Sequence, residues 1–201
     1  MERNIVVTGV GGQGVLLAAN AIGEAATATS YETRVGEIHG MSQRGGSVIA
    51  HVRYGDTVNG PMVPIGKADV IVALEPMEAL RYAQYLREDG TFLVDFETKD
   101  PFPVRYGNER YPDEERLAAE LRDRGELVRI EAVDLAREAG HPMTANVVLL
   151  GAISTLLDLG IETPSLFEAI EELVPENAVE KNRRAFELGQ KALGTRLESL
   201  H

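Results

Sequence analysis

The stretch GVGGQG, residues 9–14, constrains the fold of this chain more than any other segment. It follows the short apolar run NIVVT at 4–8, and the segment after it, 13–28, carries apolar residues at helical spacing. A GxGxxG pattern between a strand and a helix is the context in which a backbone turn can approach an anion closely. We therefore expect a strand, a tight glycine turn and a helix at the start of the chain.

Strand-like and helix-like segments alternate along the rest of the chain. After 4–8 the expected strands are 33–38, 47–55, 69–74, 91–96 and 128–133, and the expected helices are 13–28, 77–87, 113–124, 134–140, 144–159, 165–173 and 178–193. The proline-rich segment 97–112 is expected to be a loop or an extended arm.

This alternation predicts an α/β fold: a Rossmann-like, mostly parallel sheet with helices on both faces and a C-terminal helical segment. We expect a single domain over residues 1–201, because the length suits one full core. Its Rossmann-like core should span about 1–160, and C-terminal helices should span about 161–195.

The glycine turn has three interpretations. Gly9, Gly11 and Gly14 match GxGxxG, and the following helix would offer N–H groups and a positive dipole end to an anion. A nicotinamide or flavin site also needs an acid near the end of the second strand, and Glu37 is near that place. However, the loop HGMSQRGG at 39–46 follows directly and has no role in an ordinary nicotinamide site. Anion binding is the first interpretation, nicotinamide or flavin binding the second, and a turn that only packs the third.

The 39–46 loop gathers polar side chains before two glycines. Its members of interest are His39, Ser42, Gln43, Arg44, Gly45 and Gly46. An arginine offers a bidentate fork to phosphate or carboxylate, and a glycine pair lets backbone N–H groups turn toward a ligand. We interpret the loop as a ligand-binding or subunit-contact segment; the alternative is a solvated turn with an incidental arginine.

Two polar residues open the apolar helix expected at 144–159. Thr144 could be its N-cap with Asn146 incidental, or Asn146 could face a ligand or an interface, and the sequence leaves both open. The histidines show no metal-ligand spacing. His51 lies beside apolar neighbours on a strand, and we expect it to be structural, whereas the terminal His201 is expected to be disordered.

Composition excludes several classes of function. The chain has 32 acidic and 20 basic residues, and this net charge of −12 disfavours nucleic-acid binding, which needs a basic face. It has no cysteine, so it has no disulfide and no thiolate ligand for an iron–sulfur cluster. We see no signal peptide and no apolar run near the ~18 residues of a membrane helix, so we expect a cytoplasmic protein without membrane contact.

Motifs for self-sufficient catalysis are also missing. The chain has no GxxxxGK[ST] P-loop, no GxSxG elbow, and no GDG with a downstream asparagine of the kind that holds magnesium and thiamine diphosphate. It has no Tyr-x-x-x-Lys pair to serve a nicotinamide-dependent reductase as proton donor. Redox chemistry would therefore depend on a partner chain.

Several segments, read in order, resemble the gamma domain of the 2-oxoacid:ferredoxin oxidoreductases. They are GVGGQGVLLAANAIGEAA (9–26), GMSQRGGSVIAHVRYG (40–55), ADVIVALEPMEALRY (68–82), the Tyr-Pro at 111–112, NVVLLGA (146–152) and KNRRAFELG (181–189). The resemblance covers nearly the whole chain. It is greatest to a stand-alone small subunit, because no thiamine-binding or ferredoxin-like part is fused to this sequence.

The resemblance implies a subunit of an enzyme that oxidatively decarboxylates aryl 2-oxoacids with coenzyme A. The products would be an aryl-acetyl-CoA, carbon dioxide and reduced ferredoxin. A large alpha subunit would carry thiamine diphosphate, magnesium and the 4Fe-4S clusters, and ferredoxin would be met only indirectly. This chain alone would be inactive, would bind no cofactor tightly, and could form a homodimer.

The resemblance also implies that this domain helps to bind coenzyme A as a co-substrate. The candidate contacts are Gly11, Gly12, Gln13, Gly14, Ser42, Gln43, Arg44, Gly45 and Gly46, with Asn146 completing the set. The glycine turn would supply N–H donors to a phosphate, and Arg44 would pair with a phosphate or carboxylate. No catalytic acid or base is assigned to this chain. The alternatives are a stand-alone NAD(P)-dependent Rossmann oxidoreductase and a pure scaffold whose glycine turn only packs.

Overall fold

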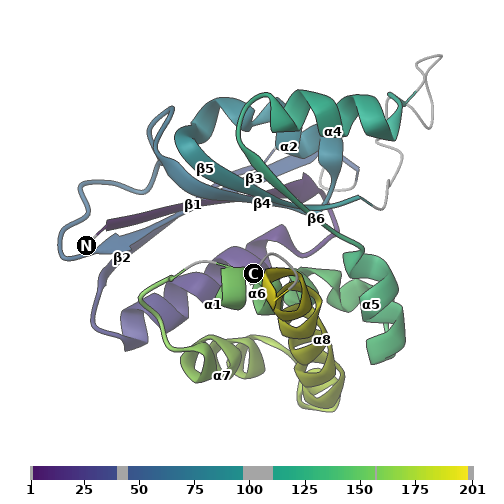
Figure 1. Ribbon diagram of the computed structural model, residues 1–201. Helices are drawn as coiled ribbons and strands as arrows, with labels where there is room; N and C mark the ends of the chain where they lie inside the picture. The colour runs from purple at the N-terminus through teal and green to yellow at the C-terminus, as the bar shows by residue number, and fades with distance from the viewer. Residues whose placement is uncertain (1, 40–44, 97–110, 157, 199–201) are drawn as a thin grey trace.

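Six strands form one sheet in the computed structural model, which describes residues 2–39, 45–96, 111–156 and 158–198 (Figure 1). The strands are β1 (Glu2–Val10), β2 (Glu32–His39), β3 (Ser47–Gly55), β4 (Ala68–Ala73), β5 (Leu86–Asp95) and β6 (Glu126–Ile130). The helices are α1 (Val15–Ala28), α2 (Pro76–Arg81), α4 (Glu114–Arg122), α5 (Ala132–Ala139), α6 (Ala145–Leu156), α7 (Thr163–Leu173) and α8 (Val179–Glu198). Short 3-10 helices are η1 (Ala83–Tyr85), η2 (Pro142–Thr144) and η3 (Glu176–Ala178).

The strand order is β2-β3-β1-β4-β5-β6, and every strand except β3 runs in the same direction. The expected α/β fold with a mostly parallel sheet is confirmed. Only residues 40–46 separate β2 from β3. A connection this short can join antiparallel strands but cannot make a parallel crossover, which needs a dozen or more residues. β3 is therefore the antiparallel neighbour of β2. It also pairs with β1 and so lies between β1 and β2, which is where the order departs from a Rossmann sheet.

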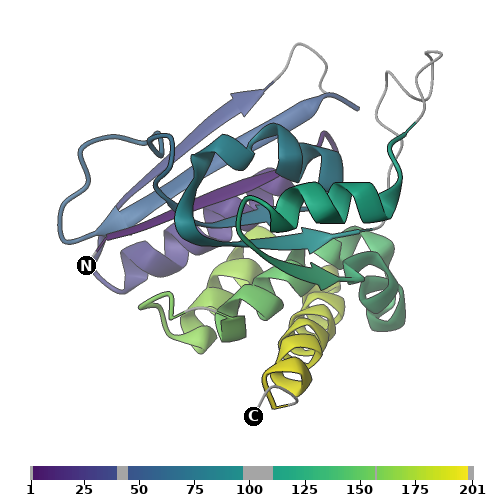
Figure 2. The ribbon, with the colours of Figure 1, turned by 45° about the horizontal axis from the view of Figure 1, so that its top comes forward.

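Helices cover both faces of the sheet, as the alternation predicts. α1, α5, α6, α7 and α8 lie on one face, and α2 and α4 lie on the other (Figure 1). Side chains alternate between the two faces along each strand: Ile5 and Val7 of β1 enter the larger core on the five-helix side, and Val6 enters the smaller core under α2 and α4. Figure 2 shows that β2 and β3 extend beyond α2 and α4.

The helix expected at 77–87 is shorter than the sequence predicted. α2 ends at Arg81, and β5 already begins at Leu86. Leu86 is buried and pairs with Ala68 of β4, so burial in the sheet outweighs continuation of the helix.

The strand expected at 128–133 also ends earlier than predicted. β6 stops at Ile130, and α5 begins at Ala132. The N–H of Ala132 donates to Oδ1 of the buried Asp95 at 3.1 Å, so a side chain at the end of β5 satisfies the first turn of α5.

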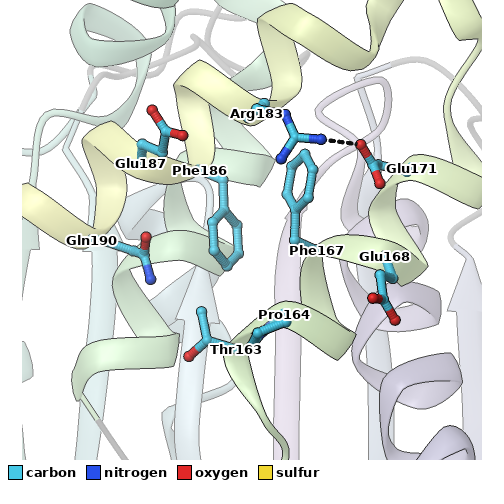
Figure 3. Close-up of a pocket in the computed structure, with 9 residues that line it drawn as sticks. All are labelled: Thr163, Pro164, Phe167, Glu168, Glu171, Arg183, Phe186, Glu187 and Gln190. Carbon is cyan, nitrogen blue, oxygen red and sulfur yellow. Dashed lines mark hydrogen bonds and ion pairs between the residues drawn. The ribbon is translucent and has the colours of Figure 1, made fainter.

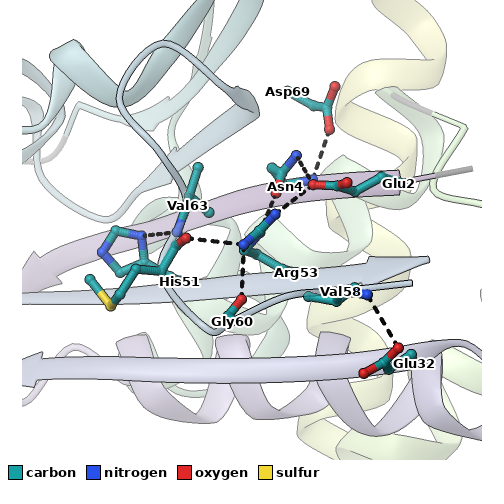
Figure 4. Close-up of polar contacts among 10 residues, drawn as sticks. Glu2, Asn4, Glu32, His51, Arg53, Val58, Gly60, Val63 and Asp69 are labelled. Carbon is teal, nitrogen blue, oxygen red and sulfur yellow. Dashed lines mark hydrogen bonds and ion pairs between the residues drawn. The ribbon is translucent and has the colours of Figure 1, made fainter. Parts of the chain in front are cut away.

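Arg53 of β3 ties the chain that follows β3 to the sheet (Figure 4). Its Nε donates to Asn4 Oδ1 at 2.8 Å, and its Nη1 donates to the Gly60 carbonyl at 2.9 Å. Its Nη2 pairs with Glu2 at 2.7 Å, and this hydrogen bond lowers the pKa of the Glu2 carboxyl. Arg53 therefore has a structural role in the fold.

His51 is fully buried on β3, as the sequence predicted for a structural histidine. Its Nδ1 accepts a hydrogen bond from the Val63 N–H at 3.3 Å, so the proton of the neutral ring lies on Nε2. Nε2 has no hydrogen-bond partner among the described residues, and the ring packs edge-on to Tyr85 with centroids 5.0 Å apart. Burial lowers the pKa of His51 from 6.5 to about 4.

Because the pKa of His51 is lowered, the free energy of unfolding decreases as the pH is lowered. Between pH 6.5 and about 4 the unfolded chain binds a proton on His51 that the folded chain does not, so stability is lost as pH falls through this window. The full effect is about 3 kcal/mol. We expect His51→Gln to remove this contribution, as measured by urea unfolding at a series of pH values. Parallel pH curves for the two proteins would contradict the assignment.

α6 and α8 cross at glycines on both helices. A Cβ at Gly189 would lie 2.0 Å from the carbonyl oxygen of Val148, and one at Gly151 would lie 2.0 Å from the carbonyl oxygen of Phe186. No side chain fits at such distances, so the two backbones touch directly. This contact seats the apolar α6 deep beneath the sheet.

Gly189→Ala should destabilise the fold by about 2–3 kcal/mol, because the two helices must move apart. Gly194 on the same helix is a matched control, since no atom of the described residues would lie within 4 Å of a Cβ there. Gly194→Ala should be neutral or stabilise by up to about 1 kcal/mol through helix propensity. Thermal unfolding followed by circular dichroism measures both variants, and equal midpoints would refute the close crossing.

Candidate functional site

The chain leaves β1 and β4 toward opposite faces of the sheet. Residues 11–14, the glycine loop, lead from β1 into α1, whereas Leu74 and Glu75 lead from β4 into α2 on the other face (Figure 1). In open α/β sheets, ligands bind outside the carboxyl ends of strands that diverge in this way. The region between the glycine loop and the start of α2, which we call the crevice, is therefore the candidate site.

Two glycines of the loop have left-handed backbone conformations, with φ +98° at Gly12 and +83° at Gly14. Among the residues that the structure describes, none would lie within 4 Å of a Cβ at Gly12, so they leave the loop open there. A Cβ at Gly14, the N-cap of α1, would lie 2.4 Å from Nδ2 of Asn146. Gly12 thus leaves room for an approaching group, and Gly14 lets α1 begin against α6.

The loop N–H groups are not all available to a ligand. The Gly11 N–H donates to the Gly46 carbonyl at 2.8 Å, and the Gln13 N–H donates to the Val10 carbonyl at 3.1 Å. No residue in the described part of the chain accepts from the N–H of Gly12 or of Gly14. Of the predicted donors, these two are best placed for an anion.

The Gln13 side chain points into the protein and joins β1 to the end of β4. Its Oε1 accepts from the Val10 N–H at 2.6 Å, and its Nε2 donates to the Leu74 carbonyl at 2.8 Å. The residue is 7% exposed. Gln13 therefore braces the crevice from inside.

The structure brings the glycine loop and the end of the 39–46 loop together. The Gly11–Gly46 hydrogen bond joins them directly, and Gly45 has φ +76°. Ser42, Gln43 and Arg44 lie outside the described residues, so their predicted contacts stay predictions.

Asn146 is buried, and its Nδ2 donates to the Gly14 carbonyl at 3.2 Å. The interpretation of Thr144 as the helix N-cap is wrong, because its Oγ1 donates to the His141 carbonyl at 2.9 Å within η2. His141 provides the cap acceptor instead, since its Nδ1 accepts from the Met143 N–H at 3.1 Å. Asn146 thus faces the glycine loop from behind, and it supports the loop from α6.

The sequence analysis missed two buried acids on the other side of the crevice. Glu75 is the N-cap of α2, and its Oε2 accepts from the Glu78 N–H at 2.8 Å. The Tyr111 hydroxyl donates to the other Glu75 oxygen. Burial raises the pKa of Glu75, and burial together with the Glu75 contact raises the pKa of Tyr111. The available signal was Glu-Pro at 75–76 after a buried strand, a helix-start pattern.

Glu78 reaches from α2 to the start of β3. It is 2% exposed, and it accepts a hydrogen bond from Ser47 Oγ and pairs with Arg81 at 3.2 Å. Ser47 Oγ also lies 2.8 Å from the Tyr82 hydroxyl. These contacts link α2 to the residue directly after Gly46.

Glu37 does not lie where a dinucleotide site needs its acid. It pairs with Ala50 of β3, and Ala50 pairs with Val7 of β1. β3 therefore separates Glu37 from the glycine-loop strand, whereas the strand that carries the acid in a Rossmann sheet lies beside it. The geometry lacks the arrangement that a nicotinamide cofactor requires.

A hollow lies between α7 and α8, where the rings of Phe167 and Phe186 pack at a tilt of 58° with centroids 5.5 Å apart (Figure 3). The Arg183 guanidinium lies 4.4 Å above the Phe167 ring and pairs with Glu171 at 2.5 Å. The residues that line this hollow include none of the candidate site residues.

No group of three His, Asp or Glu side chains suited to a metal ion occurs among the residues that the structure describes. No helix in this part of the chain is long and apolar enough to cross a bilayer.

A comparison of Gly14→Ala with Gly12→Ala tests whether the loop is tightly packed at residue 14 and open at residue 12. Both residues have positive φ, so each substitution costs about 1 kcal/mol of backbone strain. Gly14→Ala should cost about 2 kcal/mol more, because its Cβ collides with Asn146. Urea unfolding measures the difference, and Gly14→Ala combined with Asn146→Ala should recover part of it. Equal destabilisation by the two single substitutions would contradict this geometry.

The sequence matches a known family over most of its length. The family model described as pyruvate ferredoxin/flavodoxin oxidoreductase covers residues 4–192. Over 193 residues the chain is 49% identical to indolepyruvate oxidoreductase subunit IorB of Thermococcus kodakarensis, which covers 95% of this chain and 96% of the relative. The same subunit of Pyrococcus horikoshii is 48% identical with the same coverage.

A solved structure has the same fold. The gamma subunit of a keto/oxoacid ferredoxin oxidoreductase from Geobacter sulfurreducens superposes with a TM-score of 0.70 at 27% identity, over 96% of this chain and 99% of that one. The resemblance inferred from the sequence segments is confirmed. This chain belongs to the pyruvate ferredoxin/flavodoxin oxidoreductase family.

Proposed function

We propose that this chain is the small subunit of an indolepyruvate:ferredoxin oxidoreductase. The observation that carries the proposal is its 49% and 48% identity to two subunits of that name, over nearly the whole length of each. The enzyme would convert aryl 2-oxoacids and coenzyme A into aryl-acetyl-CoA and carbon dioxide, with reduction of ferredoxin. We propose a cytoplasmic location for the complex.

The redox apparatus belongs to the partner in this proposal. The chain has no cysteine, so it cannot ligate 4Fe-4S clusters through thiolates. A large alpha subunit would hold thiamine diphosphate, magnesium and the clusters, and ferredoxin would contact that subunit. This chain would contribute a binding surface and no acid or base.

The crevice is the part of this chain that we propose to contact coenzyme A. A phosphate fits there because Gly12 leaves open space beside the loop, and α1, fourteen residues long, directs the positive end of its dipole toward it. Gly12 and Gly14 would donate backbone N–H groups, while Gln13 and Asn146 hold the loop in place. Arg44, with Ser42 and Gln43, would complete the anion contacts from the 39–46 loop.

The stand-alone NAD(P)-dependent interpretation has little to support it. Neither IorB relative is named as a nicotinamide enzyme, and Glu37 lies two strands away from β1. A homodimer of the isolated chain stays a prediction.

Reconstitution tests the proposal directly. The chain alone should not reduce ferredoxin with indolepyruvate and coenzyme A, and activity should appear on mixing with the proposed large alpha subunit. Arg44→Ala should lower turnover or raise the KM for coenzyme A. An active isolated chain, or an inactive mixture of two folded subunits, would refute the proposed function.

A charge placed in the crevice tests the phosphate contact. Gly12→Asp should raise the KM for coenzyme A by at least about tenfold over Gly12→Asn, because the two side chains match in shape and differ in charge. The KM for the 2-oxoacid should stay the same in both variants. Equal KM values for coenzyme A would exclude a phosphate beside Gly12.

A further inference from the structure

Both glycine segments of the crevice depart from one rung of the sheet. Val10 at the end of β1 pairs with Ser47 at the start of β3, and this is the last pair of the ladder. The glycine loop continues from Val10, and Gly46 directly precedes Ser47. The position of this rung therefore sets the position of both segments.

Polar side chains hold each side of the rung. On the β1 side, Gln13 accepts from the Val10 N–H and donates to the Leu74 carbonyl. On the β3 side, Glu78 accepts from Ser47 Oγ. The Gly11–Gly46 hydrogen bond of 2.8 Å then connects the two segments just beyond the rung.

Glu78 is itself held rigidly. Its backbone N–H donates to Glu75, its side chain is 3% exposed, and Arg81 pairs with its second oxygen. The Tyr111 hydroxyl donates to Glu75 and fixes the helix start on which Glu78 depends. A hydrogen bond to a buried, fixed carboxylate is stronger than one to a neutral group.

We infer that Glu78 is a positioning residue for the crevice: acting through Ser47, it fixes Gly46 and hence the glycine loop in the conformation that receives a phosphate. The inference rests on the proposed coenzyme A contact and adds to it a residue that touches no ligand. Glu78 approaches from α2, so both helices that flank the crevice contribute to the geometry of one loop.

A purely structural role for Glu78 makes a different prediction. In that case its loss would lower stability without changing the loop or the affinity for coenzyme A. Thr8→Val is the matched control, because Thr8 is fully buried, its Oγ1 donates to the Val48 carbonyl at 2.9 Å, and it lies in the same ladder. This substitution removes one buried hydrogen bond without touching the last rung.

Hydrogen exchange of the full-length chain is the first measurement. Glu78→Ala and Ser47→Ala should each raise amide exchange in residues 9–14 by about tenfold or more, since each loses a charge-assisted hydrogen bond. Glu78→Gln should raise it less, because its amide oxygen can still accept. Thr8→Val should leave exchange in 9–14 within twofold of the wild type.

Kinetics of the complex reconstituted with the large subunit is the second measurement. Glu78→Ala and Ser47→Ala should raise the KM for coenzyme A by about tenfold, with kcat and the KM for indolepyruvate within twofold of the wild type. The double variant should raise the KM by clearly less than the product of the two single effects, because both substitutions remove the Ser47–Glu78 contact. Glu78→Gln should restore part of the affinity, and Thr8→Val should not change it.

The outcomes separate the inference from the proposed function. Unchanged exchange in residues 9–14, or raised exchange with an unchanged KM for coenzyme A, overturns the positioning role while the wild-type complex stays active. Additive effects in the double variant also overturn it. If the wild-type complex is inactive, the proposed function fails, and the exchange data alone then decide whether Glu78 fixes the loop.

Discussion

The Gln13 side chain makes the contact on which the architecture of the crevice depends. β1 and β4 are parallel neighbours, and their chains diverge to opposite faces of the sheet. Where strands diverge, the ladder can no longer pair the backbone, and the groups left over must find other partners. Gln13 provides these partners: its Oε1 accepts from the Val10 N–H, and its Nε2 donates to the Leu74 carbonyl. One amide side chain thus lets the sheet open without leaving buried polar groups unpaired.

The same principle explains why the loop is bordered by buried polar residues rather than by exposed ones. Asn146 satisfies the Gly14 carbonyl from α6, and Glu75 caps α2. Each is nearly inaccessible to water, and each holds a backbone group in place. These supports therefore come from within this chain.

Much of this fold could be predicted from the sequence, since the signals were local. The apolar run, glycine turn and periodic segment of residues 4–28 identify β1, the loop and α1. The antiparallel pairing of β3 with β2 was also implied, because seven residues between two strands cannot make a parallel crossover. That limit does not decide which side of β2 faces β1, so the insertion of β3 between them, which separates Glu37 from the glycine loop, is seen only in the structure.

The supporting contacts could not be predicted in this way, because they join residues distant in sequence. Tyr111 and Glu75 are separated by 36 positions, and Asn146 and Gly14 by 132. A buried Gln, Asn or Glu looks in sequence like any polar residue near a helix start, and only burial reveals that it needs a partner. The sequence pattern therefore identifies the glycines of the loop but not the side chains that hold them in place. In the proposed function, where the chemistry lies on a partner, those side chains would contribute by holding the glycine loop in place.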